Sequence, residues 1–164
     1  MCLSYWYDDR GAASNPLVKN LINGMGIGCY FAGPFEVITG RSMLSGKGDA
    51  AIWVLMIMGA IATTSHAQDL RDKEGDRAAG RETLPNMVGD MNARLLAVLG
   101  IIGWTCIAAS YWGVGWMKGG ISGIAGAVMA GNMLRDRTRT GDILTWKFFP
   151  LWMFGLFLMP VWAQ

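Results

Sequence analysis

The chain has 164 residues, of which 52% are hydrophobic and only 16% are charged, and its formal net charge is +2. Soluble domains carry about 25% charged residues, so too little polar sequence is left here to cover a soluble helical core. The net charge says little by itself, and no nucleic-acid partner is expected.

Five apolar windows are candidate transmembrane helices, at residues 17–39, 50–67, 95–111, 120–134 and 143–161. A span needs about 20 mostly apolar residues, and the second, third and fifth windows meet this best. The fourth is short and glycine-rich, and the first carries the polar residues Lys19, Asn20, Asn23 and Glu36. We predict an all-α, polytopic membrane helix bundle with about five transmembrane helices, forming one membrane domain over residues 1–164.

Residues around the windows indicate where helices start and how closely they pack. Asn15-Pro16 is a typical helix start, Pro85 is expected to end the charged segment after the second window, and Gly89-Asp90 marks a further turn. Small residues four apart let membrane helices approach closely. They occur as Gly24 and Gly28, and in the fourth window as two rows, one of Gly119, Gly123, Ala127 and Gly131 and one of Ser122, Gly126 and Ala130.

Basic residues fall unequally on the two sides of a five-span bundle. One side collects eleven: Arg10, Lys19, Arg71, Lys73, Arg77, Arg81, Arg94, Arg135, Arg137, Arg139 and Lys147. The other side has three: Arg41, Lys47 and Lys118. The positive-inside rule therefore predicts a multi-pass protein whose aspartate-rich loop faces the cytosol, in the endoplasmic reticulum if the protein is eukaryotic.

Residues 68–81 hold the densest charge of the chain. Asp69, Asp72 and Asp76 stand at i, i+3 and i+7, which places three carboxylates along one stripe of a helix. Such a stripe favours a hard divalent cation, most often Mg²⁺ shared with a substrate phosphate. The neighbouring basic residues suited to phosphate oxygens are Arg71, Lys73, Arg77 and Arg81. A solvated charged loop is the alternative interpretation.

The pattern Asp69-x-x-Asp72-x-x-Gly75-Asp76-x-x-x-Gly80-Arg81-x-Thr83-x-Pro85 resembles the second aspartate-rich motif of the UbiA superfamily of intramembrane prenyltransferases. The resemblance covers 17 residues with ordered spacings, and the helices around it resemble the second half of that fold. The sequence of residues 65–69 resembles that of a fungal branch of this superfamily, some of whose members are terpene cyclases.

The resemblance implies Mg²⁺-dependent transfer of a prenyl group from an allylic diphosphate to a small-molecule acceptor within the membrane. Asp72 and Asp76 would be the catalytic metal ligands, with Asp69 as a third metal contact. The diphosphate would be held by Lys73, Arg77 and Arg81. Lys19, at the cytosolic end of the first window, points either at the diphosphate or at the membrane interface. A terpene cyclase on the same scaffold uses the same residues and stays the alternative.

The chain departs from the family pattern in one respect. The family's first motif, of the type Asn-Asp-x-x-Asp, does not occur in these 164 residues, and Asp8-Asp9 lacks both its Asn and its third acidic residue. We therefore expect a C-terminal half of a longer protein or a truncated product, completed by a missing N-terminal half. Whether the chain alone is an enzyme stays open, and a non-catalytic membrane fragment or accessory subunit is the third hypothesis.

Several further residues allow more than one interpretation. His66 contacts substrate or is a satisfied core histidine, and Glu36 has a functional or a structural role. Arg135, Arg137 and Arg139 contact diphosphate or anionic lipid, or act only as topology signals. Trp146, Trp152 and Trp162 are expected to pack or to lie at the membrane interface. A carbocation would be stabilised by an aromatic side chain among Tyr30, Phe31, Trp104, Tyr111 and Trp112.

Overall fold

The computed structural model describes residues 5, 14–40, 48–115 and 119–162. The helices are α2 (Pro16–Thr39), α3 (Asp49–Thr64), α4 (Ala67–Ala78), α5 (Leu84–Val88), α6 (Asp90–Tyr111), α7 (Gly120–Arg135) and α8 (Arg139–Trp162). The described residues contain no strand. The all-α prediction is confirmed, and each of the five apolar windows forms one long helix.

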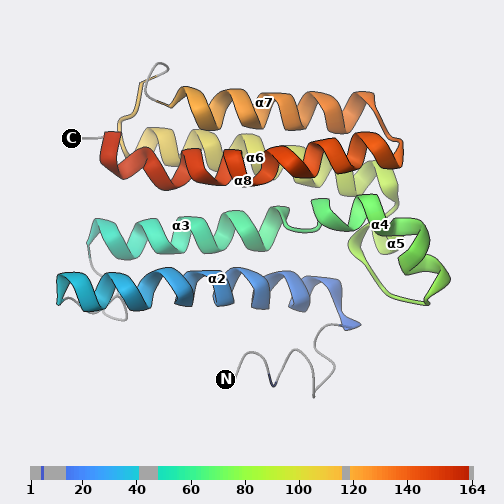
Figure 1. The fold of residues 1–164 in the computed structure, drawn as a ribbon, viewed down its shortest axis with the longest axis horizontal. Coiled ribbons are helices and arrows are strands. Elements are labelled where there is room, and N and C mark those ends of the chain that lie inside the picture. The colour runs from blue at the N-terminus through green and yellow to red at the C-terminus, as the bar shows by residue number, and fades with distance from the viewer. Residues whose placement is uncertain (1–4, 6–13, 41–47, 116–118, 163–164) are drawn as a thin grey trace.

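The five long helices run side by side in alternating directions, and α4 and α5 lie together at one end of the bundle (Figure 1). α6, α7 and α8 pack against one another, α3 packs against α6, and α2 packs on α3 at the edge of the bundle. This arrangement brings the start of α2, the α4–α5 region and the α7–α8 connection to the same end.

Three helical segments among the described residues are long and apolar enough to cross a membrane: Asp49–Ala78, Asp90–Tyr111 and Arg139–Val161. The first of them joins α3 to α4. α2 and α7 are not among the three, and α7 has only 16 residues. The helical membrane bundle is therefore supported by three helices that are apolar by themselves, while α2 and α7 pack beside them.

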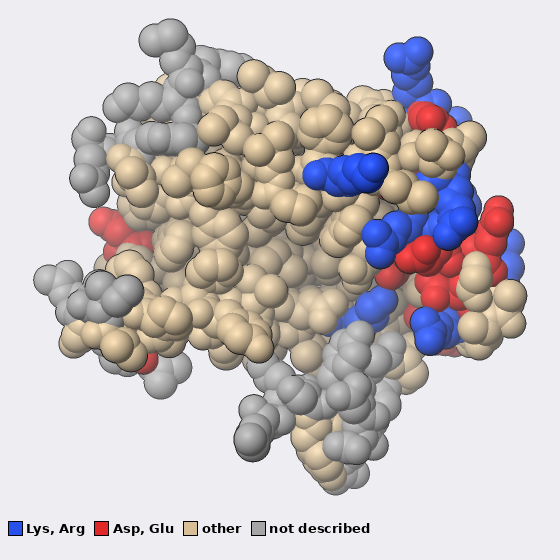
Figure 2. Space-filling view, viewed as in Figure 1, with Lys and Arg blue, Asp and Glu red and all other residues tan. Residues whose placement is uncertain are grey.

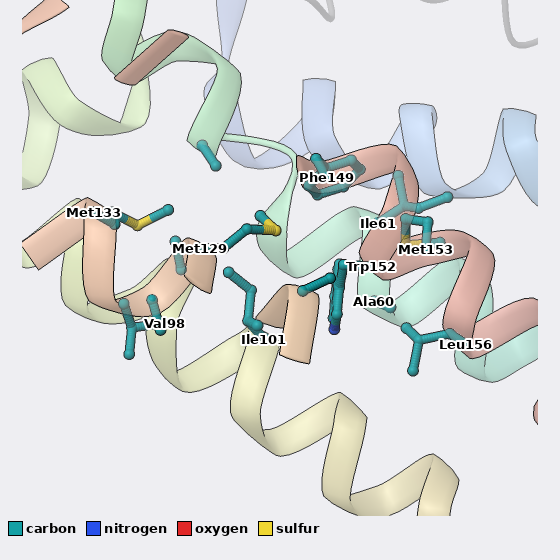
Figure 3. Packing of buried hydrophobic residues seen from close by; sticks show 14 of the residues in the cluster. Ala60, Ile61, Val98, Ile101, Met129, Met133, Phe149, Trp152, Met153 and Leu156 are labelled. Carbon is teal, nitrogen blue, oxygen red and sulfur yellow. The ribbon is translucent and has the colours of Figure 1, made fainter. Parts of the chain in front are cut away.

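The core lies where α3, α6, α7 and α8 meet. Ile101, Met129 and Trp152 are fully buried there, with Ile61 and Leu156 packed beside them (Figure 3). Trp152 also donates its indole N–H to the Thr105 hydroxyl at 2.9 Å. Since a buried indole N–H needs an acceptor, this bond lets a polar ring occupy the centre of an apolar core. Of the two roles expected for Trp152, packing and a place at the membrane interface, the structure shows packing.

Small residues let α2 approach α3 closely, and they also line the buried face of α7. A Cβ on Gly24 would lie 2.5 Å from the Met58 carbonyl oxygen, so α2 approaches α3 as closely as the Gly24 and Gly28 spacing predicts. In α7, the row of Ser122, Gly126 and Ala130 is buried. Gly123 and Gly131 of the other row have open space at their Cβ positions, so only one of the two predicted rows packs.

Local capping sets the helix boundaries, and the structure corrects the prediction made for Pro85. The Asn15 side chain accepts from the backbone N–H groups of Leu17 and Val18, which caps α2 as expected. Pro85 was expected to end the charged segment, but it lies in the first turn of α5, where its missing N–H is not needed. Gly89, with φ of 89°, separates α5 from α6.

Most of the charged side chains gather at the end of the bundle where α4 and α5 lie (Figure 2). This grouping agrees with the predicted sidedness of the loops for the described part of the chain. Arg10, Arg41, Lys47, Lys118 and the Asp8-Asp9 pair lie outside the described residues. The cytosolic orientation and the endoplasmic reticulum stay predictions.

Candidate functional site

The start of α4 is fixed by polar contacts to neighbouring helices. His66, at the break between α3 and α4, is buried and donates from Nε2 to the Ala93 carbonyl oxygen at 3.0 Å. The Ser65 hydroxyl donates to Asn20 Oδ1 at 3.2 Å. His66 is therefore a satisfied core histidine that ties the α3–α4 break to α6.

The end of α4 explains why glycine and arginine follow the aspartates. Gly80 adopts φ of 67°, and the Arg81 N–H donates to the Asp76 carbonyl oxygen at 2.8 Å. The Gly80 N–H donates to the Arg77 carbonyl oxygen at 3.2 Å, which completes a Schellman cap. The cap turns the chain back so that Arg81 Nη1 lies 3.5 Å from Asp76 Oδ1. Gly80 thus positions Arg81 beside the last aspartate.

The three aspartates occupy one stripe of α4 in three different environments. Asp69 is buried, and its Oδ1 accepts from Lys19 Nζ at 2.9 Å, while its buried Oδ2 has no hydrogen-bond partner among the described residues. The Asp72 side chain is 50% exposed and accepts from Arg71 Nε at 3.0 Å. The Asp76 side chain is 12% exposed. All three carboxylates therefore have a basic partner, and Asp72, in the middle of the stripe, is the most exposed of them.

Two clefts flank α4. The loop-side cleft, of about 790 Å³, lies between α4 and the α7–α8 connection, and its charged lining residues are Arg71, Asp72, Lys73, Glu74, Asp76, Arg81, Arg137 and Arg139. The α2-side cleft, of about 970 Å³, lies between α4 and the start of α2, and its charged lining residues are Lys19, Asp69, Arg71, Asp72, Asp76, Arg81 and Glu82. Four charged residues border both clefts: Arg71, Asp72, Asp76 and Arg81.

The residues predicted to contact diphosphate do not all border the same cleft. Lys19 and Arg81 border the α2-side cleft together with all three aspartates. Lys73 borders only the loop-side cleft, and its Nζ donates to Asp90 Oδ1 at 2.7 Å. Arg77 is exposed and borders neither cleft. The structure therefore brings Lys19 and Arg81, and not Arg77, to the carboxylate stripe.

A buried ion network that the sequence analysis did not single out holds this end of the bundle together. The Arg94 guanidinium is fully buried and donates to Asp142 at 2.6 and 2.8 Å and to Asp90 at 2.9 Å. It also donates to the Met133 carbonyl oxygen at 3.0 Å. Through Asp90 the network reaches Lys73, so α4, α6, α7 and α8 share one set of charges. The i, i+4 spacing of Asp90 and Arg94 was the available signal.

The α7–α8 connection is closed by its own hydrogen bonds. Asp136 Oδ1 accepts from the Thr138 hydroxyl at 2.6 Å and from the Thr138 N–H at 3.0 Å. These two bonds stabilise the charged form and lower the pKa of the Asp136 carboxyl. The Gly141 N–H donates to the Thr138 hydroxyl at 3.2 Å, which joins the connection to the first turn of α8.

Within the described ranges, no three His, Cys, Asp or Glu side chains converge closely enough to hold a metal ion by themselves. Mg²⁺ usually takes one or two carboxylates and completes its octahedron with water and substrate phosphate oxygens. Asp72 and Asp76 offer such a pair, and the unpartnered Oδ2 of Asp69 lies beside the same cleft. The donor set thus fits a metal shared with a phosphate.

Aromatic residues gather near the opposite end of α3 and α6. Trp104, Trp112 and Trp53 border an apolar cavity of about 10 Å³, which is far too small for a prenyl chain. The Phe31 ring packs against Phe157 at 4.4 Å, and the Tyr30 side chain is 80% exposed. The structure therefore groups some of the predicted aromatic residues without assigning any of them to a carbocation.

Comparison with known proteins identifies the family of this chain. The chain belongs to the UbiA prenyltransferase family, whose sequence profile matches residues 1–161. The family resemblance predicted from the aspartate motif is confirmed. No protein of experimentally solved structure shows significant similarity to the chain.

Three relatives of the chain come from fungi, and others come from a bacterium and an archaeon. The chain is similar to the fumagillin beta-trans-bergamotene synthase of Aspergillus fumigatus, at 31% identity over 158 residues, which cover 96% of this chain and 54% of that protein. A diterpene cyclase of Hericium erinaceus is 33% identical over 101 residues, 62% of this chain and 32% of its own length. A polyprenyl transferase of the same organism is 32% identical over 96 residues, 58% of this chain and 33% of its own length. The chain spans about half the length of the bergamotene synthase.

Proposed function

We propose that this chain carries the diphosphate-binding part of an intramembrane prenyltransferase, which moves a prenyl group from an allylic diphosphate to an acceptor in an Mg²⁺-dependent reaction. The observation that carries the proposal is the α2-side cleft. Three carboxylates, Asp69, Asp72 and Asp76, line it from one helix, and Lys19 and Arg81 stand beside them. Carboxylates and basic side chains in one cleft suit a diphosphate–metal complex better than either charge alone would.

Each residue in the cleft has a separate task in this proposal. Asp72 and Asp76 would hold the metal, which neutralises the diphosphate as the C–O bond ionises. Lys19 and Arg81 would bind diphosphate oxygens through charge-assisted hydrogen bonds. Because Asp69 already pairs with Lys19, it would orient that lysine and contribute its unpartnered oxygen as a third metal contact.

A terpene cyclase is the second candidate function, and one observation favours it. The relative that aligns with 96% of this chain is named a bergamotene synthase, and a second relative is named a diterpene cyclase. The same aspartate stripe would serve a cyclase, because both reactions begin when an allylic diphosphate ionises. The two functions differ in whether an acceptor or the prenyl chain itself captures the cation.

A non-catalytic membrane protein is the third candidate. The motif Asn-Asp-x-x-Asp is absent from the 164 residues, so one helix supplies all the carboxylates of the proposed site. Each 1.4 kcal/mol of lost transition-state stabilisation slows ionisation about tenfold. We therefore expect this chain, expressed alone, to consume a prenyl diphosphate slowly or not at all unless carboxylates from another chain complete the site.

The test is product analysis on membranes carrying the chain, incubated with Mg²⁺ and farnesyl or geranylgeranyl diphosphate, with and without an aromatic acceptor. A prenylated acceptor would support the transferase, and a hydrocarbon formed without acceptor would support the cyclase. Asp72→Asn is the test variant. Asp49→Asn is the matched control, because it makes the same chemical change at the other end of the bundle, where Asp49 accepts from the Tyr111 hydroxyl. Where the unchanged chain, alone or together with a chain that completes the site, consumes prenyl diphosphate measurably, equal consumption by the two variants would contradict the proposed site.

A further inference from the structure

We propose that the loop-side cleft is a metal-independent phosphate-binding site formed by Arg137 and Arg139. The group it would bind is a phosphate or diphosphate, supplied either by a free diphosphate or by the headgroup of an anionic phospholipid. The proposal goes beyond the prenyl-transfer proposal, because it concerns the other side of α4 and needs no metal.

The first support is the balance of charge across the two clefts. Of the described residues, five basic and three acidic ones line the loop-side cleft, while three basic and four acidic ones line the α2-side cleft. The loop-side cleft therefore has a basic excess and attracts an anion directly. The α2-side cleft has an acidic excess, so an anion would enter it together with a cation.

The second support is the pairing of the basic residues. Arg71 pairs with Asp72, Lys73 pairs with Asp90, and Arg81 pairs with Asp76. The side chains of Arg137 and Arg139 form no hydrogen bond or ion pair with any described residue. The basic excess of the cleft therefore resides in two guanidinium groups whose donors are all available to a ligand.

The third support is the short, internally bonded connection that carries the two arginines. Asp136 and Thr138 are joined by two hydrogen bonds, and the Asn132 side-chain amide donates to the Gly141 carbonyl oxygen at 2.8 Å. A Cβ on Gly141 would lie 2.5 Å from the Asp136 carbonyl oxygen, so this turn requires glycine. Arg137 and Arg139 therefore extend from a backbone that is already ordered, which lowers the entropic cost of binding an anion.

The opposite wall of the cleft is held to the bundle as well. The Arg71 guanidinium carbon lies 5.8 Å from the centre of the Trp146 ring of α8, and Lys73 reaches Asp90 of α6. Both walls are thus attached to α8. A phosphate group between them would meet Arg137 and Arg139 on one side and Arg71 on the other.

The test measures binding of inorganic diphosphate to the full chain in neutral detergent with EDTA present, by calorimetry. We expect the wild-type chain to bind, and each of Arg137→Gln and Arg139→Gln to weaken binding about tenfold. Arg135→Gln is the matched control: it removes the same charge at the end of α7, but Arg135 lines neither cleft, so binding should change less than about twofold. A second arm measures retention of phosphatidic acid from mixed nanodiscs by the same variants.

Each result of the two binding measurements either supports or overturns the proposed phosphate site. Diphosphate binding that is lost in the Arg137 and Arg139 variants supports a site for free diphosphate. Phosphatidic acid retention that is lost in those variants, without diphosphate binding, supports a lipid headgroup site. No binding in either arm, or an equal loss in Arg135→Gln, overturns it. EDTA separates this site from the prenyl-transfer proposal, because the α2-side cleft would take up diphosphate together with a cation, whereas the loop-side cleft would bind it without one.

Discussion

The loop-side cleft and the α2-side cleft share one wall and differ in the other. Both use Arg71, Asp72, Asp76 and Arg81. The α7–α8 connection adds to the first two arginines that have no ion-pair partner among the described residues, and α2 adds to the second a lysine that is already paired with Asp69. The comparison shows that one charged helix produces two different electrostatic environments, according to which neighbour faces it. The sign of each cleft is therefore a property of helix packing.

The largest effect is expected from the network that supports both clefts. Arg94→Met removes the cation between Asp90 and Asp142 and leaves Asp142, whose side chain is fully buried, without its partner. Loss of one partner from a buried ion pair costs about 3–5 kcal/mol. The free energy of unfolding in mixed micelles measures this, with Arg135→Met as the exposed control. The double variant Arg94→Met/Asp142→Leu should recover most of the loss, and equal stability of the single variant and the control would contradict the network's role.

The next effect concerns catalysis in a context where the proposed site is complete. Asp72→Asn and Asp76→Asn each replace a charged metal ligand by a neutral one, and each should lower Mg²⁺-dependent prenyl diphosphate consumption by about a hundredfold or more. Asp69→Asn should have a smaller effect, because Asp69 is paired with Lys19. Initial rates at saturating Mg²⁺ measure this. If Asp69→Asn were the most damaging of the three, the assignment of metal ligands would be wrong.

A smaller effect distinguishes the α2-side cleft from its neighbour. Lys19→Met leaves the buried Asp69 carboxylate without its cation and should lower the free energy of unfolding by about 2 kcal/mol. Lys19→Arg should recover part of it, since a guanidinium also reaches a carboxylate. Diphosphate binding in EDTA should be unchanged in both variants, because Lys19 does not line the loop-side cleft. A change in that binding would mean that the two clefts are not separate sites.

The smallest effect tests the helix end that both clefts share. Gly80→Ala places a side chain at φ of 67° and should cost about 1 kcal/mol of stability, while it displaces Arg81 from Asp76. Gly75→Ala is the matched control: Gly75 lies inside α4 with open space at its Cβ position, so alanine there should stabilise the helix by up to about 1 kcal/mol. Opposite signs of the two shifts in unfolding free energy are the expected result, and equal signs would contradict the cap.

Local patterns predicted several features of this protein well. The spacing of Asp69, Asp72 and Asp76 predicted a single stripe, and α4 confirms that the segment is helical. The apolar windows predicted five long helices, and all five form. These features depend only on neighbours in the chain, because helical periodicity fixes which residues share a face.

Contacts between distant segments were predicted less well. Lys73 and Arg77 seemed equivalent as diphosphate contacts, but Lys73 pairs with Asp90 and Arg77 points to neither cleft. The two small-residue rows of α7 looked alike, and only one packs. In both cases the sequence presents similar residues, and the choice depends on which helix lies opposite.

The sequence by itself determined the class of this protein: a helical membrane bundle of the UbiA prenyltransferase family with a carboxylate stripe on a helix next to a glycine cap. Only the tertiary structure decided which charges are paired. Arg94 is buried between Asp90 and Asp142, while Arg137 and Arg139, at the edge of a cleft, have no ion-pair partner in the described part of the chain. The physical reason is that an ion pair depends on distances of a few ångströms between side chains from separate helices, which no local spacing specifies.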